Sequence, residues 1–199
     1  SQVNPHFLYN TMDTIIWLIE AEKTQEAVEM VSSLSSFFRH SLSRGRDVIT
    51  LGEEEEHVRS YLQIQQVRYK DIMRYTINLA PELGDVLIPK LTLQPLVENA
   101  LYHGVKLKRG PGHIYVVGRA EGEDILLQVT DDGVGMSPER LEELRSALDR
   151  GERVGFGLST VHERVRLFFG PPYGLSISSQ QGVGTTISVR IPRRKEGAL

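Results

Sequence analysis

A histidine and an asparagine stand one helical turn apart near the start of the chain, in the stretch NPHFLYN at residues 4–10. Side chains four residues apart share one face of a helix, so Asn10 could orient the ring of His6. A neutral imidazole offers a ring nitrogen as a nucleophile or a metal ligand, and it can also pack as an ordinary helix residue. A metal site needs more than two ligands, and no third ligand accompanies this pair. The stretch alone therefore leaves a reactive and a structural role for His6 open.

A second polar pair lies in LQPLVENALYHG at residues 93–104, where Asn99 and His103 are also one turn apart. The amide oxygen of Asn99 is a hard ligand that suits Mg²⁺, which prefers oxygen donors and keeps water and substrate phosphates around it. Glu98 stands next to Asn99 and could assist through a water molecule. An ordinary surface amide would give the same pattern, so this stretch alone is a weak indication of a metal site.

The stretch DDGVGM at residues 131–136 combines a carboxylate with two glycines directly after a predicted strand. Asp131 could accept a hydrogen bond from an exocyclic amino group such as that of adenine. Gly133 and Gly135 would let the backbone come close to a flat ligand. The alternative is an ordinary Asp-Gly turn with no ligand.

Two further glycine-rich stretches follow. In GFGLSTVHERVRLFFG at 155–170, Gly155 and Gly157 lead straight into a helix, whose first N–H groups and positive dipole end favour a phosphate. The stretch matches neither the Walker pattern nor a dinucleotide fingerprint. The charged segment between residues 136 and 155 could fold over a nucleotide as a lid. In GVGTTISVRIP at 182–192, a glycine turn leads to Thr185 and the final predicted strand.

The residues that position His6 are predicted to be helical. Apolar residues fall at helical spacing over 6–42, which predicts one long helix, and a second helix is predicted over 50–69. Thr50 is the expected N-cap of the second helix, and the acidic run at 53–56 suits its first turn. The two helices would form a hairpin with one exposed apolar stripe. Pairing two copies into a four-helix bundle would bury that stripe, so we expect a homodimer.

The remaining motifs are predicted to lie in a mixed α/β structure. Alternating and β-branched residues predict strands over 73–79, 113–119, 124–130, 175–180 and 185–191. The last two strands are predicted to form a hairpin around the turn QGVG. Helices are predicted over 91–103, 138–149 and 158–168. This order favours an α/β sandwich with helices on one face of a mixed sheet. We therefore expect an α+β chain with a helical domain at 1–70 and a ligand-binding domain at 71–199.

Composition narrows the function classes. The chain has 199 residues, of which 40% are hydrophobic and 25% charged, as is usual for soluble globular proteins. A formal net charge of −3 argues against a dedicated nucleic-acid binder, and the lack of cysteine excludes disulfides and thiolate metal sites. No apolar stretch reaches the roughly 18–20 residues that span a bilayer. Because the chain begins without methionine, we expect that an N-terminal portion, membrane-embedded or not, precedes it.

The order and context of these motifs over residues 75–192 resemble the ATP-binding domain shared by gyrase, heat-shock-90 chaperones, histidine kinases and mismatch-repair proteins. The resemblance implies a Bergerat α/β sandwich that holds Mg·ATP. It places Asn99 on the metal, Asp131 on the adenine amino group and Thr185 in support of the adenine site. The nucleotide-binding residues that we predict are Asn99, His103, Asp131, Gly133, Gly135, Gly155, Gly157, Leu158 and Thr185.

One position departs from part of that group. The gyrase, chaperone and repair ATPases carry a glutamate one turn before the asparagine to activate water, and Pro95 stands there in this chain. A proline cannot act as a base, so the resemblance disfavours a water-splitting ATPase.

Over nearly its whole length, through QVNPHFLYNTM, LTLQPLVENALYHG and GFGLSTVHERVRLFFG, the chain resembles sensor histidine kinases of the LytS/YesM type. The resemblance implies that His6 accepts the phosphoryl group of ATP, with Mg²⁺ at Asn99, and passes it to an aspartate of a response regulator. It also implies the cytoplasmic part of a membrane-anchored protein. In-line attack on a phosphate needs positioning and charge neutralisation more than covalent help. Glu98 is a candidate general base only if the two domains close together.

Three alternatives remain open on the sequence alone. A serine-directed kinase of the same ATP-binding group would need neither the helical hairpin nor His6. A chaperone- or gyrase-type ATPase would need the glutamate that is missing at position 95. A degenerate dimer module would not bind ATP.

Overall fold

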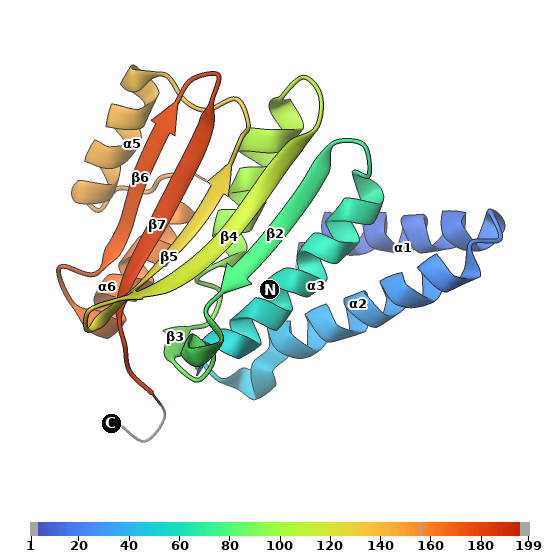
Figure 1. The fold of residues 1–199 in the computed structure, drawn as a ribbon, viewed down its shortest axis with the longest axis horizontal. Helices are drawn as coiled ribbons and strands as arrows, with labels where there is room; N and C mark the ends of the chain where they lie inside the picture. Colours follow the sequence, from blue (N-terminus) through green and yellow to red (C-terminus); the bar gives the residue numbers. More distant parts are fainter. Residues whose placement is uncertain (1–3, 156, 196–199) are drawn as a thin grey trace.

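The computed structural model describes residues 4–155 and 157–195. Within these residues, three N-terminal helices lie beside a five-stranded sheet, and further helices lie behind the sheet (Figure 1). The α-helices are α1 (Pro5–Glu20), α2 (Thr24–Leu42), α3 (Leu51–Arg68), α4 (Gln94–Asn99), α5 (Pro138–Asp149) and α6 (Leu158–Phe169). The strands are β1 (Val48–Thr50), β2 (Met73–Leu79), β3 (Leu87–Pro89), β4 (Gly112–Glu121), β5 (Asp124–Asp131), β6 (Gly174–Gln180) and β7 (Gly184–Pro192).

The chain reverses direction inside the segment for which the sequence predicted one long helix. That prediction is wrong, because α1 ends at Glu20 and α2 begins at Thr24. Glu22 has a left-handed φ of 60°, and the Lys23 N–H donates to the carbonyl of Leu18 at 2.8 Å. This is a Schellman-type helix end, which usually has glycine at the left-handed position. The predicted two-helix hairpin is therefore a three-helix arrangement of α1, α2 and α3.

An aromatic cluster joins the three N-terminal helices. The ring of Phe7 in α1 has its centroid 4.9 Å from that of Phe37 in α2 and 5.2 Å from that of Tyr61 in α3. Phe37 also stacks on His57 of α3, with 4.6 Å between centroids. All three aromatic side chains are buried, and such pairs add to the stability that burial alone gives. The first turn of α1, which carries His6, is thereby fixed against α2 and α3.

Helix α3 is shared between the two parts of the molecule. It begins as predicted with a capping box, in which the side chains of Thr50 and Glu53 each accept the other residue's backbone N–H. It contacts α2 on one side and both α4 and β2 on another. Just before it, β1 pairs with β3, with Val48 opposite Pro89. The boundary predicted at residue 70 stays a prediction, and it falls where both parts share one core.

The main sheet has the strand order β2-β4-β5-β7-β6, with β2 parallel to β4 and the other neighbours antiparallel. The five predicted strands and the QGVG hairpin are confirmed. Along β4, Ile114 and Val116 are buried whereas Tyr115 is exposed, as expected when one face of a sheet is covered. Helices α5 and α6 lie behind this sheet in Figure 1. The predicted α/β sandwich with a mixed sheet is confirmed.

The helices of this part follow the predictions with one adjustment. Those predicted over 138–149 and 158–168 correspond to α5 and α6. The helix predicted over 91–103 starts later, at Gln94, and continues after Asn99 as a π-helical turn, Ala100–Gly104. Pro95 fits in the first turn of α4 because that turn leaves N–H groups without partners anyway. A π turn inside a helix is frequent at functional sites.

Among the residues that the structure describes, none of the helices is both long enough and apolar enough to cross a membrane.

Candidate active site

A cavity of about 260 Å³ opens between the sheet and helices α4, α5 and α6. Its apolar walls come from the loop after β5, from α5 and from the last two strands, through Val134, Met136, Leu144, Ile177 and Ile187. Six of the predicted nucleotide-binding residues line it: Asn99, His103, Asp131, Gly135, Leu158 and Thr185. Four motifs that are far apart in the sequence thus meet around one apolar space.

Asp131 is a buried carboxylate at the end of β5, and only 3% of its surface is exposed. Burial raises the pKa of its carboxyl to about 6, and neighbouring Asp132 adds to this shift. Hydrogen bonds from backbone N–H groups act in the opposite direction, and one of them, from Gly133, is 2.9 Å long. Above pH 6 the site therefore offers a fixed, charged acceptor on an otherwise apolar wall, which is what a purine amino group needs.

Gly133 lies against the backbone of a second glycine, Gly104, at the end of the π turn. A Cβ atom added at Gly133 would stand 2.1 Å from the carbonyl carbon of Gly104. In addition, the Val134 N–H donates to the Gly104 carbonyl at 3.3 Å. The sequence prediction included Gly133 but missed Gly104, although a glycine directly after a predicted helix was a signal for it. Only glycine allows the loop after β5 to approach the end of this helical segment so closely.

Gly135 is required for a different reason. Its φ of +65° is left-handed, and a Cβ there would stand 2.1 Å from the carbonyl oxygen of Gln180. The loop after β5 is thus pressed against the end of β6.

A hydroxyl network holds the next part of the same loop. The Thr185 hydroxyl lies 2.8 Å from that of Ser179, and Ser179 accepts the Met136 N–H at 2.9 Å. Thr185 is also the β7 residue paired with Asp131. The predicted supporting role of Thr185 thus has a structural basis, in which Ser179, absent from the sequence prediction, is the intermediate.

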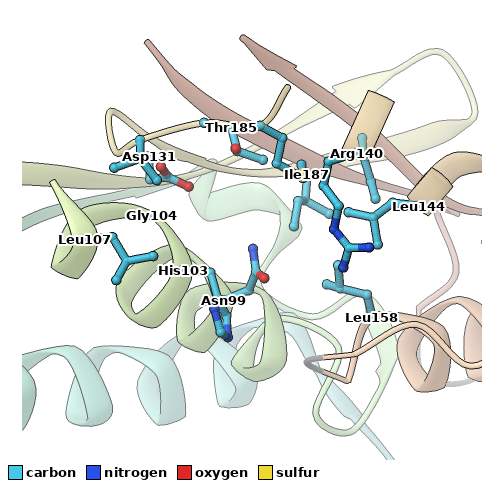
Figure 2. Close-up of a pocket in the computed structure, with 14 residues that line it drawn as sticks. Asn99, His103, Gly104, Leu107, Asp131, Arg140, Leu144, Leu158, Thr185 and Ile187 are labelled. Atoms are coloured by element: carbon cyan, nitrogen blue, oxygen red, sulfur yellow. The ribbon is translucent and has the colours of Figure 1, made fainter. Parts of the chain in front are cut away.

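Asn99 and His103 reach the cavity from the helical segment opposite. Figure 2 shows the Asn99 amide pointing into the cavity, between Asp131 on one side and Arg140 and Leu158 on the other. Burial lowers the pKa of the His103 imidazole. Among the described residues, no group of three or more His, Asp or Glu side chains could hold a metal ion by itself. An amide oxygen together with substrate phosphates and water is the donor set that suits Mg²⁺, so Asn99 fits the predicted metal role.

Arg140 is a cavity residue that the sequence prediction missed. It lies in the first turn of α5, and its guanidinium extends into the cavity towards Asn99 and Leu158 (Figure 2). One of its nitrogens lies 3.2 Å from a carboxylate oxygen of Glu143, and its side chain is half exposed. A cation on the lid-side helix is suited to a phosphate, and the charged composition of 136–155 was the only signal for it.

Most of the predicted lid is a fixed helix. Arg145 of α5 donates twice to the Ile177 carbonyl of β6, at 3.0 and 2.6 Å, and Leu141, Leu144 and Leu148 are buried. The connection after α5 is more exposed, since residues 150–153 and Gly155 are exposed, although Val154 is buried. Whether it closes over a nucleotide stays a prediction.

The glycines before α6 have unequal positions. Gly157 is the N-cap, with a left-handed φ of 74°, and Leu158 lines the cavity. Neither of these two glycines lines the cavity; Gly155 is exposed, and Phe156 lies outside the described residues. The Ser159 hydroxyl bonds both the N–H and the carbonyl of Val154, which fixes the loop where it enters α6. The phosphate role of Gly155 and Gly157 stays a prediction.

His6, Asn10 and Glu98 do not line the cavity. His6 is exposed in the first turn of α1, where its N–H donates to the Asn4 side chain at 2.9 Å. Asn10 is half-buried one turn away. Glu98 accepts a hydrogen bond from Gln94 at 3.1 Å, and burial raises the pKa of its carboxyl. Glu98 also raises the pKa of the buried Tyr61 phenol of α3, after the larger effect of burial, so it lies on the side of the helical region.

Two family descriptions match the chain. The family described as histidine kinase matches residues 1–73. The family described as histidine kinase-, DNA gyrase B-, and HSP90-like ATPase matches residues 84–195. The second match contains the whole cavity.

Curated relatives match over nearly the entire chain. It is 39% identical over 196 residues to the sensor histidine kinase YesM of Bacillus subtilis, covering 98% of this chain and 33% of that protein. It is 35% identical over 98% of its length to the sensor histidine kinase BtsS of Escherichia coli, and 34% identical over 99% to the sensor protein LytS of Bacillus subtilis. The chain spans about a third of the length of these relatives.

Solved structures agree on the fold. The catalytic domain of histidine kinase ThkA matches with a TM-score of 0.56 at 16% identity, over 73% of this chain and 94% of that one. The histidine kinase domain of a blue-light activated kinase from Erythrobacter litoralis matches with a TM-score of 0.55 at 17% identity, over 96% and 90%.

Proposed function

The chain belongs to the sensor histidine kinases of the LytS/YesM type, with the ATP-binding domain of that group, and from this premise we propose that it transfers the γ-phosphoryl group of Mg·ATP to His6. The observation that carries the proposal is the polarity of the cavity. A buried carboxylate, Asp131, lies at one end, and the Arg140 cation lies at the other with the Asn99 amide between them. A purine amino group suits the first end and phosphates suit the second.

The proposed residues have separate roles. Asp131 accepts from the adenine amino group, and Gly133 and Gly135 bring the loop backbone beside the base. Thr185 supports the adenine end, while Gly155, Gly157 and Leu158 lie at the phosphate end. Asn99 would hold Mg²⁺, which would supply positive charge beside the phosphates. His103 and Arg140 also line the cavity, and we assign both to contacts with the phosphates.

The transfer step follows from these positions. A neutral ring nitrogen of His6 attacks the γ-phosphorus, a P–N bond forms, and the bond from that phosphorus to the β–γ bridging oxygen breaks, releasing ADP. The imidazole then gives up its ring proton to a base. Glu98 is the candidate base when the two domains close together, because burial raises its pKa and it lies outside the cavity, towards the helical region. Asn10 orients the ring of His6 from one turn away.

His6 has to reach a nucleotide from outside the cavity, and exposed apolar faces on α1 and α2 suggest how the helices are arranged when it does. On α1, Tyr9, Met12, Ile16 and Ile19 recur every three or four residues and are all about half exposed or more. On α2, Val28 and Val31 are similarly exposed. Exposed apolar stripes of this kind mark a protein interface. We propose that a second copy covers them, forming a homodimer with a four-helix bundle.

A response regulator with an acceptor aspartate is the proposed downstream partner, because the relatives are named sensor kinases and phosphohistidine needs an acceptor. Placement of the chain on the cytoplasmic side of a membrane-anchored protein belongs to the same proposal.

The test incubates the chain with Mg²⁺ and γ-labelled ATP and examines the label on the protein. We expect a label that is acid-labile and alkali-stable, as a phosphoramidate is, and that falls to background in His6→Gln. The matched control is His113→Gln, which changes a histidine of the sheet bonded to Thr76. It should leave labelling unchanged. An acid-stable label, or equal labelling of His6→Gln, would exclude the proposal. Release of inorganic phosphate with no labelled protein would favour an ATPase instead.

A further inference from the structure

Glu54 of α3 is a buried carboxylate that bonds the start of α4. None of its surface is exposed. One carboxylate oxygen accepts the N–H groups of Leu93 and Gln94 at 3.2 and 3.4 Å, and the other accepts that of Leu91 at 3.1 Å. The first N–H groups of a helix have no partners within it, and its positive end favours a negative charge. Glu54 therefore supplies from a different helix the cap that α4 lacks in its own sequence.

The backbone at this point is strained. Leu91 has a φ of 61°, which is unfavourable for a leucine. Such a conformation persists only where the surroundings impose it, and the Glu54 bond to the Leu91 N–H is one such constraint. The adjoining Lys90 carbonyl accepts from Arg164 of α6. Burial raises the pKa of the Glu54 carboxyl to about 7, and the N–H donors and Arg164 oppose that shift.

Gln65 of α3 bonds the other end of the same helical segment. It is also fully buried, and its amide nitrogen donates to the Tyr61 hydroxyl at 3.0 Å and to the Tyr102 hydroxyl at 3.1 Å. Tyr102 belongs to the π turn that follows α4, between Asn99 and His103. One buried side chain of α3 thus connects the aromatic cluster of the helical region to the turn beside the cavity.

The two contacts lie at opposite ends of the segment that carries Asn99. Glu54 and Gln65 are eleven residues apart, close to three helical turns, so they share one face of α3. Their partners are the turn just before α4, at residues 91–94, and Tyr102 in the π turn after it. Within the second segment, Glu98 and Tyr102 lie on the α3 side, and Asn99 and His103, each one residue later, line the cavity. Residues on adjacent faces of one helical segment move together.

We propose that Glu54 and Gln65 are positioning residues: by fixing both ends of the segment from Leu91 to Tyr102, they set where Asn99 and His103 stand relative to the phosphates. Helix α3 is consequently the element through which the packing of α1 and α2 controls the phosphate end of the nucleotide site. This inference takes from the proposed function only that Asn99 and His103 serve Mg·nucleotide. The adenine end is held mainly by hydrogen bonds within β5, β6, β7 and the loop after β5, and it meets the π turn at Gly104, beyond Tyr102, so it should respond less than the phosphate end.

The test separates the two ends of the cavity. Affinity is measured for adenosine, which occupies only the adenine end, by NMR titration, and for Mg·ADP by calorimetry. The variants are Glu54→Gln, Gln65→Leu and the milder Tyr102→Phe. The matched controls are Glu56→Gln and Gln63→Leu, the same changes on the exposed side of α3.

We expect Glu54→Gln and Gln65→Leu to weaken Mg·ADP binding by about tenfold, because each removes bonds to a buried partner, and Tyr102→Phe by about threefold. Adenosine affinity should change by less than about twofold in all of them, as should both affinities in the controls. The rate of His6 labelling at saturating ATP should fall in the same variants. A purely structural role would not predict this loss in a variant that folds.

Two outcomes would overturn the inference. One is unchanged Mg·ADP affinity in Gln65→Leu and Tyr102→Phe. The other is an equal loss of adenosine and Mg·ADP affinity, which would indicate general loosening. If Glu54→Gln does not fold, as urea unfolding would reveal, the other two variants decide. Because both affinities are measured without phosphoryl transfer, a chain that never labels His6 would refute the proposed function and still allow this test.

Discussion

The nucleotide cavity and the α1–α2 helices differ in how much of each is complete within one chain. In the cavity the key polar group, Asp131, is buried and its position is fixed by hydrogen bonds. In α1, His6 is exposed and does not line the cavity. The apolar side chains follow the same division, since Leu144 and Ile187 face inward whereas Ile16 and Ile19 face solvent. The difference indicates a preorganised cavity beside a helix that carries the proposed acceptor and needs further contacts to act.

Helix α3 lies between the two regions and belongs to both. Its buried residues face α2 on one side and the start and end of the Asn99 segment on the other. The cavity and the region of the proposed acceptor can thus be coupled without a flexible linker between them. Two kinds of change test this difference: substitutions on the exposed faces of α1 and α2, and substitutions at the residues that hold the cavity in shape.

We expect the largest effect, on self-association, when a charged residue is introduced into the exposed apolar stripe of α1. Ile16→Glu should weaken self-association by about a thousandfold, because a symmetric interface would bury one unpaired carboxylate from each copy. Sedimentation velocity over a range of concentrations would measure it. Leu167→Glu, the same kind of change at an 84% exposed leucine of α6, is the control. If Ile16→Glu and the wild type associate equally, α1 is not an interface and the acceptor region is complete by itself.

Gly133→Ala tests the preorganisation of the cavity most directly. The added methyl group would stand 2.1 Å from backbone atoms of Gly104, so the loop after β5 must move and take Asp131 with it. Overpacking of this size corresponds to about a hundredfold loss of adenosine affinity. Gly84→Ala is the control, because φ there is −60° and the nearest atom lies at 3.3 Å. Unchanged adenosine binding in Gly133→Ala would show that the loop is adaptable and not preorganised.

Local patterns predicted most of the sheet region. Alternation identified β2 and β5, and glycines next to Asp131 identified the loop after β5, because each signal lies within about ten residues. The end of α1 was missed because Glu22 holds a position where glycine is usual. Strands β1 and β3 were missed because each has three residues and depends on a distant partner.

Site residues, too, were predicted only where the signal is local in the sequence. Asp131 and Asn99 were predicted from their neighbours in the sequence, and Thr185 from the resemblance to the ATP-binding group. Glu54 was read only as part of an acidic helix start, since nothing in the run 53–56 distinguishes the one carboxylate that is buried against residues 91–94. Arg140 was missed because a charged helix gives no sign of which side chain turns inward. Contacts between distant segments decide these roles, and a single sequence does not reveal them.

Lowering the pH should weaken the binding of adenosine at the adenine end of the cavity. The pKa of Asp131 is raised to about 6 by burial, so the carboxylate is charged above that pH and protonated below it. Adenosine affinity should therefore be level above about pH 7 and fall by up to about tenfold for each unit below pH 6. Adenosine is the right probe because it has no phosphate that would respond to protonation of His103. Asp131→Asn should bind adenosine weakly at every pH, and a wild-type profile that is flat down to about pH 5 would remove Asp131 from the adenine role.

The smallest expected effect lies at the phosphate end. Arg140→Ala should weaken ADP binding by about threefold to tenfold and leave adenosine unchanged, because a guanidinium–phosphate contact is strong but this side chain is half exposed. Calorimetry at low and high salt would measure it, and the difference between variant and wild type should shrink as salt screens the charge. Arg119→Ala, on the exposed face of β4, is the control for a lost positive charge. An effect on adenosine as large as that on ADP would mean that Arg140 supports the apolar wall through its aliphatic stem, and the division of the cavity into an adenine end and a phosphate end would then have to be redrawn.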